Sequence, residues 1–249
     1  MQTKQIVLTA EKAQTYLKDP ILFAFYDFTG LTDEAAQLLC GKERLTLKQL
    51  SGLSDSAAKI LGAHKGPLSL PGLKNISDAA LQYLCRNNGP MDLSGLEGIS
   101  PAAAKLLSAL PGELRLNGLK ELNPQIAGLL SAHYGPVYLN GLQSLSPEAA
   151  KALSANEGVL ILDGLKAIPD ELAAAFAGHR GDLCFNNAKT LSPAAARHLN
   201  NPPHSVALGF TLLSAETAEA LADWPGTLCL SKLKGLNSDA AQALSRHKG

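Results

Sequence analysis

The feature that most constrains this chain is a repeat of 22 or 23 residues that runs through almost all of its 249 residues. In each unit an apolar residue precedes a Ser, Thr or Asn, with Pro169 as the one exception. These apolar residues are Leu8, Leu31, Leu53, Ile76, Ile99, Leu122, Leu145, Ile168, Leu191, Leu213 and Leu236. A unit of this length cannot bury its own leucines, so the units must stack and cover one another's apolar flanks. The repeat therefore predicts a solenoid.

Each unit contains two periodicities. A segment such as 68–70 (Leu-Ser-Leu) alternates with period two, which predicts a short strand with one buried side. A Ser or Asn then precedes an Ala-rich stretch, often with Pro between them as in Ser146-Pro147, and this predicts a capped two-turn helix. The Asn-Gly and Asp-Gly pairs after the strands predict turns with positive φ. A glycine such as Gly135 predicts a left-handed helix cap.

Stacking strands and helices in register predicts a curved stack. Neighbouring strands lie ~4.8 Å apart and neighbouring helices ~8–10 Å apart, so the strands must take the inner arc. The expected fold is an α/β solenoid with short parallel strands on the concave face and short helices on the convex face. We expect residues 1–20 to form an N-terminal capping half-repeat and residues 21–249 to form ten repeats in a single domain.

The residues from Leu68 to Leu84 read L-x-L-x-G-L-x-x-I-S-D-x-x-L-x-x-L. This pattern resembles the leucine-rich repeat family, and most of all its cysteine-containing subtype, L-x-L-x-G-C-x-x-I-T-D-x-x-L-x-x-L. Leu occupies most of the Cys column here, and Phe28, Ala188 and Phe210 also depart from it. The resemblance implies a right-handed horseshoe that recognises another protein through its concave strand face.

Charge and composition exclude several classes of protein. The 22 Lys and Arg residues balance 22 Asp and Glu residues, without the positive excess typical of nucleic-acid binders. No apolar run approaches the ~18 residues that cross a bilayer, so no membrane partner is expected. Residues 1–10 lack the apolar core of a secretory signal, which predicts a cytoplasmic protein. Export by a route without a cleaved signal stays open.

The sequence contains no motif of an enzyme. It has no G-x-S-x-G elbow, no phosphate-binding glycine-lysine loop and no G-x-G-x-x-G after a strand. We therefore predict a non-catalytic chain without a cofactor.

The cysteines predict free thiols. Cys184 and Cys229 share a strand column two units apart, which places their Cα atoms ~10 Å from each other and beyond disulfide reach. Cys40 and Cys85 share a helix column and lie farther apart.

Four histidines, His64, His133, His179 and His247, recur in one register of the repeat. The closest pair is two units apart, or ~20 Å on the helix side, so they cannot share a metal ion. We interpret them as structural residues at helix ends, where a cation suits the terminal carbonyl groups.

The outward strand positions are the candidate partner-binding site, because packing does not fix them. The candidates are Arg44, Lys48, Asp92, Glu113, Arg115, Tyr138, Ile161 and Asp182. Arg and Tyr are favoured interface anchors, so Glu113, Arg115, Tyr138 and Ile161 are expected to form a patch in neighbouring strands. A solvated sheet with incidental variation is the alternative.

A column of Asn and Asp follows the strands at 117, 140, 163 and 186, and we interpret it as turn residues rather than as a ladder. The irregular stretch 186–210 is interpreted as local drift of the repeat. The C-terminal unit carries no polar cap, which favours either a fragment of a longer protein or self-association through that edge.

These observations predict a module that binds a partner protein or peptide on its concave face. The alternatives are a structural spacer or assembly element, and the repeat part of a larger secreted effector.

Overall fold

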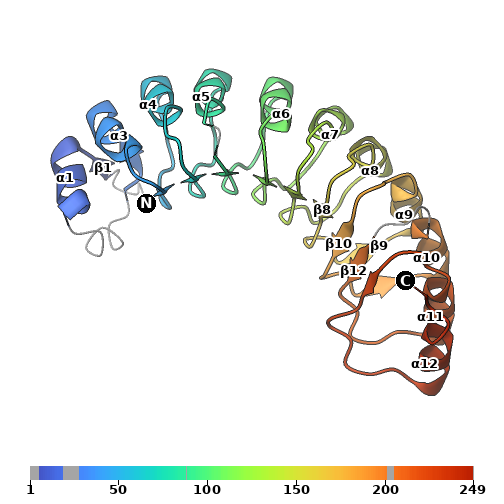
Figure 1. Cartoon of the computed structure of the whole chain (residues 1–249). Coiled ribbons are helices and arrows are strands. Elements are labelled where there is room, and N and C mark those ends of the chain that lie inside the picture. The colour runs from blue at the N-terminus through green and yellow to red at the C-terminus, as the bar shows by residue number, and fades with distance from the viewer. Residues whose placement is uncertain (1–5, 19–27, 88, 201–204, 249) are drawn as a thin grey trace, which may run out of the picture. The chain divides into compact units, whose positions relative to one another are not determined.

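The computed structural model describes residues 6–18, 28–87, 89–200 and 205–248, and the chain divides into two compact units. Unit 1 is Met1–Leu119 and unit 2 is Lys120–Gly249. Within each unit, helices lie along one side and strands along the other (Figure 1). We call the outward surface of the strands the strand face of that unit.

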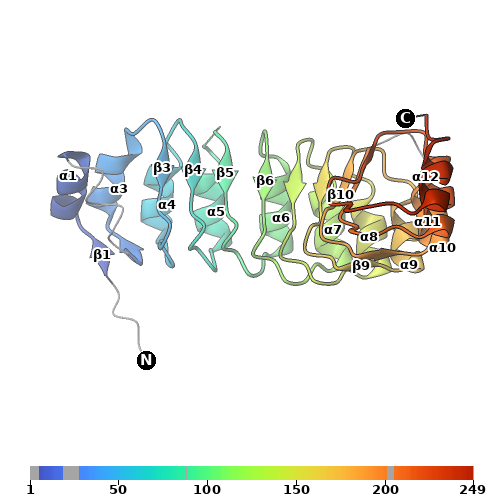
Figure 2. The ribbon, with the colours of Figure 1, turned by 90° about the horizontal axis from the view of Figure 1, so that it is seen from below.

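Unit 1 alternates strands and helices in chain order. Its elements are β1 (Val7–Leu8), α1 (Ala10–Lys18), β2 (Gly30–Leu31), α3 (Asp33–Cys40), β3 (Leu45–Thr46), α4 (Asp55–Leu61), β4 (Leu68–Ser69), α5 (Asp78–Leu84), β5 (Met91–Asp92), α6 (Pro101–Ser108) and β6 (Leu114–Arg115). Strands β3 to β6 pair in parallel with their neighbours, and β1 pairs with β2. Figure 2 shows β3, β4 and β5 side by side.

Unit 2 follows the same order, except that a second short strand precedes α9 and α10. Its elements are α7 (Pro124–Leu130), β7 (Val137–Tyr138), α8 (Pro147–Leu153), β8 (Leu160–Ile161), β9 (Ala167–Ile168), α9 (Asp170–Phe176), β10 (Leu183–Phe185), β11 (Thr190–Leu191), α10 (Pro193–Leu199), β12 (Val206–Leu208), α11 (Ala215–Ala222), β13 (Leu228–Cys229) and α12 (Ser238–Leu244). Strands β7, β8, β10, β12 and β13 form one parallel ladder, and β9 pairs with β11.

The leucine columns of the repeat form the core of each unit. Leu68 pairs in register with Leu45 on one side and with Met91 on the other, so equivalent residues stack. Leu68 and Leu70 are completely buried, as are Leu160 and Leu162 in unit 2. Burying each such side chain contributes about 1.5–3 kcal/mol, gained only when the neighbouring repeat is in place. The predicted α/β repeat with parallel strands is confirmed.

The predicted helix starts are also confirmed. Ser146 accepts the N–H of Ala149 with its hydroxyl, and Pro147 fills the first helical position of α8. In several repeats the capping serine also donates its hydroxyl to the Asp that opens the preceding helix. The pairs are Ser77 with Asp55, Ser100 with Asp78, and Ser192 with Asp170. The capping serine therefore starts its helix and also links it by a hydrogen bond to the preceding repeat.

The predicted turns are present at 117–118, 140–141 and 163–164, but the positive φ expected of their glycines is wrong. Among the described residues only Gly112 has a positive φ, and no residue other than glycine has one. Helix α7 ends at Leu130, and its C-cap residue Ser131 has right-handed geometry, without the left-handed cap expected at Gly135. Instead, a Cβ added at Gly164 would lie 2.1 Å from the carbonyl oxygen of Leu142, and one at Gly118 would lie 2.5 Å from that of Leu96. Glycine is needed there because adjacent repeats approach so closely.

The histidines lie at the helix exits as predicted, and three of the four are buried, whereas His247 is half-buried. His64, His133 and His179 are at most 1 % exposed. Burial lowers the pKa of His179, although backbone carbonyl groups, that of Ser154 first, oppose the shift. The unit positions between His64 and His179 also hold Asn87, Leu110 and Asn156, and the two asparagines are as buried as the histidines. The column is thus largely polar and internal: the rings of His64 and His179 and the amides of Asn87 and Asn156 meet the backbone of an adjacent repeat.

Candidate functional site: the strand faces

The strand face of unit 1 places Arg44 and Lys48 on either side of β3, where both are exposed. Two strands away, Asp92 faces the same side but its carboxylate is already occupied. It accepts hydrogen bonds from the hydroxyl of Ser69 at 3.1 Å and from the backbone N–H and hydroxyl of Ser94. The charged groups of Arg44 and Lys48 are therefore more accessible than the carboxylate of Asp92 on this part of the face.

Glu113 and Arg115 bind each other. Arg115 lies opposite Asp92 in the β5–β6 register, and its guanidinium donates from Nε and Nη2 to one carboxylate oxygen of Glu113. Both side chains are partly exposed, Arg115 at 39 % and Glu113 at 45 %. Their pairing holds the guanidinium in a fixed position on the strand face, which suits a contact residue.

The strand face of unit 2 carries Tyr138 and Ile161 side by side in the β7–β8 register. Ile161 was expected to be outward and open, but it is only 9 % exposed. It lies between Tyr138 and Cys184 on the neighbouring strands, and side chains on one face of a sheet cover one another at this spacing. Tyr138 is half-buried.

Glu113 and Arg115 belong to unit 1, whereas Tyr138 and Ile161 belong to unit 2. Each pair is adjacent within its own unit. A single patch formed by all four residues stays a prediction.

Asp182 precedes β10, and one of its oxygens accepts the backbone N–H of Ser205 at 2.9 Å. Cys184 lies two residues further along the chain. Burial raises the pKa of this thiol to about 11, and the negative charges of Asp163 and Asp182 add to the shift. The strand face of unit 2 therefore holds two carboxylates close to a thiol that stays protonated at neutral pH.

The Asn and Asp column after the strands is a ladder of hydrogen bonds, and not only a set of turn residues. Asn140 accepts the backbone N–H of Asp163 at 3.0 Å, and Asp163 accepts that of Asn186 at 2.8 Å. Asn186 also donates its side-chain amide to Asp163. The side chain of each repeat thus fixes the backbone of the next.

Asn187 belongs to the irregular stretch 186–210, which was interpreted as drift of the repeat, and Lys232 was not singled out from the sequence. Asn187 and Lys232 replace the glycine of the repeat, and Lys232 Nζ donates to Asn187 Oδ1 at 2.7 Å across the intervening repeat. Asn187 in turn donates to the carbonyl oxygen of Asp163. Loss of the glycine in two nearby repeats was the signal that could have indicated this bridge.

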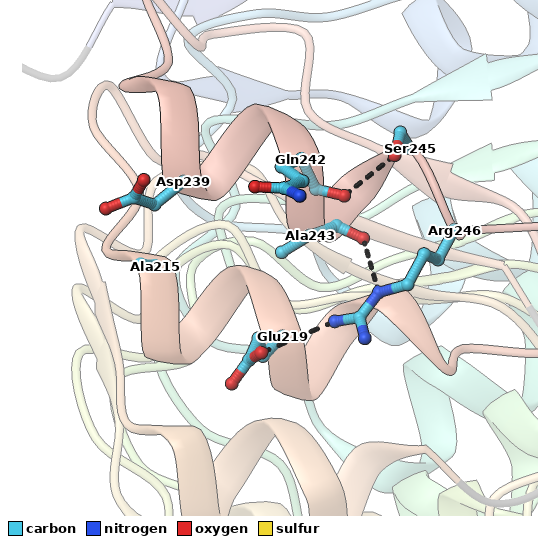
Figure 3. A pocket seen from close by; sticks show the side chains of 7 residues that line it. All are labelled: Ala215, Glu219, Asp239, Gln242, Ala243, Ser245 and Arg246. Carbon is cyan, nitrogen blue, oxygen red and sulfur yellow. Dashed lines mark hydrogen bonds and ion pairs between the residues drawn. The ribbon is translucent and has the colours of Figure 1, made fainter.

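A shallow hollow of about 440 Å³ lies on the helix side of unit 2, between α11 and α12 (Figure 3). Ala215 and Ala243 contribute to its lining. Arg246 donates to the carbonyl oxygen of Ala243 and pairs with Glu219 at 3.5 Å. Because its one cation, Arg246, is already paired with Glu219 and both members of this pair are largely exposed, we regard the hollow as a gap between small residues.

The cysteines are free thiols, as predicted, and Ala207 lies between Cys184 and Cys229 in the strand register. In the described part of the chain, no three His, Cys, Asp or Glu side chains gather closely enough to hold a metal ion. None of the described helices has the length and apolar character needed to cross a membrane.

No protein-family model and no curated protein matches the sequence. Among the solved structures that are similar to it are the following two. A leucine-rich repeat protein of Leptospira interrogans is 17% identical with a TM-score of 0.49, over 99% of this chain and 69% of that one. A chain of the Drosophila Toll–Spatzle complex is 14% identical with a TM-score of 0.48, over 88% of this chain and 34% of that one. Neither similarity bears on function, and the cysteine-containing subtype stays a prediction.

Proposed function

We propose that the chain is a non-catalytic module that binds a partner protein or peptide through its strand faces. The observation that carries this proposal is the contrast between the two sides of the strands. Inward positions are apolar throughout and leucine in most repeats, with Met91, Val137 and Val206 among the exceptions, because stacking fixes them. The central outward positions vary: they read Thr46, Ser69, Asp92 and Arg115 in unit 1, and Tyr138, Ile161, Cys184, Ala207 and Cys229 in unit 2.

The strand face of unit 1 would contribute charged contacts. Arg44 and Lys48 are exposed, and no described carboxylate lies within ion-pair distance of either. Arg115 adds a guanidinium oriented by Glu113. Arginine is enriched among the residues that dominate binding energy, so Arg115 is the strongest candidate contact in this unit.

The strand face of unit 2 would contribute aromatic and apolar contacts. Tyr138 offers a half-buried ring beside Ile161, and tyrosine combines apolar area with a polar hydroxyl group. Asp182 supplies a carboxylate close to this surface.

The test is affinity capture from the source cell with variants of each unit. Arg115→Ala in unit 1 and Tyr138→Ala in unit 2 are expected to weaken capture of the same partner. Two exposed residues away from the strands, Lys105 on α6 and Tyr134 in the loop after α7, are the matched controls. If Lys105→Ala or Tyr134→Ala removes the partner while both strand-face variants retain it, the proposal is wrong.

A second candidate is an assembly element, favoured by the flank of β13 and α12. Leu228, Leu230, Leu233 and Leu244 are only partly buried there, and Leu236 is 39 % exposed. No described repeat covers this flank, so a second copy of the chain could do so. Light scattering over a range of concentrations tests this: the chain should associate and Leu236→Lys should dissociate it. A monomer at every concentration discards this candidate.

The cytoplasmic location and the larger secreted effector stay predictions.

A further inference from the structure

The strand face of unit 2 has an uncharged central column that crosses five strands. The column consists of Tyr138, Ile161, Cys184, Ala207 and Cys229, which follow one another in the parallel register. At ~4.8 Å between strands it is about 19 Å long. An extended segment of roughly six residues, at ~3.3 Å per residue, spans that length.

Two carboxylates flank this column on opposite sides. Asp182 lies two residues before Cys184, and Asp163 lies two residues after Ile161 on the adjacent strand. The negative charge of each reaches the Cys184 thiol, which places both beside the middle of the column.

Neither carboxylate is paired with a cation of the described chain. Asp182 accepts the backbone N–H of Ser205, and Asp163 accepts the backbone and side-chain N–H groups of Asn186. These donors are neutral, so the negative charges are oriented but not balanced. Lys232, on the same strand face, donates to the side-chain oxygen of Asn187 instead.

We infer that the strand face of unit 2 binds an extended, apolar and basic segment of the partner. Apolar side chains of that segment cover the column, and Lys or Arg side chains reach Asp163 and Asp182. The inference rests on the proposed function and names the chemistry of its partner. An acidic segment is disfavoured, because its carboxylates would approach two uncompensated negative charges.

Three labelled octapeptides test this charge and apolar preference by fluorescence anisotropy: alternating Val-Lys, alternating Val-Glu and alternating Ser-Lys. The Val-Lys peptide is expected to bind at least about tenfold more tightly than either of the others, and added salt should weaken it. Similar affinity for Val-Glu overturns the charge preference. Similar affinity for Ser-Lys overturns the role of the apolar column. Absence of Val-Lys binding up to about 1 mM overturns the inference as a whole.

Variants locate the interaction. Asp163→Asn and Asp182→Asn keep an oxygen for the backbone N–H that each accepts, so the fold should survive, as circular dichroism will verify. Each should weaken Val-Lys binding by about three- to tenfold. The control is Glu171→Gln on the exposed side of α9, which should bind unchanged. Equal binding by folded Asp163→Asn, Asp182→Asn and the parent chain contradicts the assignment.

Partner capture distinguishes failure of this inference from failure of the proposed function. If the peptides do not discriminate but Tyr138→Ala still weakens capture of the cellular partner, the inference falls and the proposed function stands. If neither strand face affects capture, both fall.

Discussion

Asn156 donates its side-chain amide to the carbonyl oxygen of His133, one repeat earlier in the chain. The side-chain oxygen Oδ1 of Asn156 accepts the backbone N–H of Gly158 at 2.8 Å. Asn156 is completely buried, so water cannot replace these bonds. In unit 1, Asn87 makes the same contacts with the carbonyl oxygen of His64 and the N–H of Gly89.

Replacing this amide should be costly. Asn156→Ala removes the partners of a buried carbonyl and a backbone N–H, and we expect the free energy of unfolding to fall by about 2–3 kcal/mol. Urea denaturation measures it. Asn75→Ala, at an exposed position of unit 1, is the control and should change the free energy by less than about 0.5 kcal/mol. Equal losses for the two variants would show that this buried amide does not stabilise the stack.

The buried imidazole of His179 should make stability depend on pH. Burial lowers its pKa in the folded chain, whereas in the unfolded chain it is near 6.5. As pH falls through about 6.5, the unfolded state takes up the proton first, so the free energy of unfolding decreases. The decrease ends below the lowered folded-state pKa.

Urea denaturation at about pH 7.5 and 5.5 measures this dependence. His179→Asn, which places in this column the residue found at Asn156, should reduce the difference between the two pH values. His198→Asn, at an exposed position, should leave it unchanged. An unaltered pH dependence in His179→Asn contradicts the prediction.

Gly178 and Gly181 allow two effects of a glycine to be tested separately. One is the close approach of a neighbouring backbone, and the other is the conformational freedom of the chain. A Cβ at Gly181 would lie 1.9 Å from the carbonyl oxygen of Gly158, while one at Gly178 would meet nothing within 4 Å. Gly181→Ala should therefore lower the free energy of unfolding by about 1–3 kcal/mol or more. Gly178→Ala should be neutral or stabilise by up to about 1 kcal/mol. Similar thermal midpoints for the two variants would refute the close-approach argument.

The four thiols should differ in reactivity. Burial raises the pKa of Cys85 and Cys184 to about 11, and the reactive form is the thiolate. At about pH 8 both should react with iodoacetamide more slowly than in the unfolded chain, where the pKa is near 8.5. Cys229 is exposed and should react first, so Cys229→Ser should remove the fast phase. Mass spectrometry of the labelled peptides measures the order, and early labelling of Cys184 contradicts it.

Some of the candidate site could be predicted from residue spacing alone. Because side chains alternate along a strand, the spacing placed Arg44, Asp92 and Arg115 on the strand face without knowledge of their neighbours. It could not show that two serines occupy the carboxylate of Asp92 or that Glu113 binds Arg115, since those contacts depend on side-chain conformations. Nor could it show that Ile161 is covered by adjacent strands.

The sequence by itself determined the repeat, the strand–helix order and the helix starts. These depend on local properties: apolar alternation in Leu68–Leu70, the hydroxyl of Ser146 and the fixed φ of Pro147 act within a few residues. Only the tertiary structure decided why Gly164 must be glycine, why His179 is buried and which carboxylates remain without a cation. Those features arise where one repeat meets the next, and the distance between two stacked backbones is set by the packing of both.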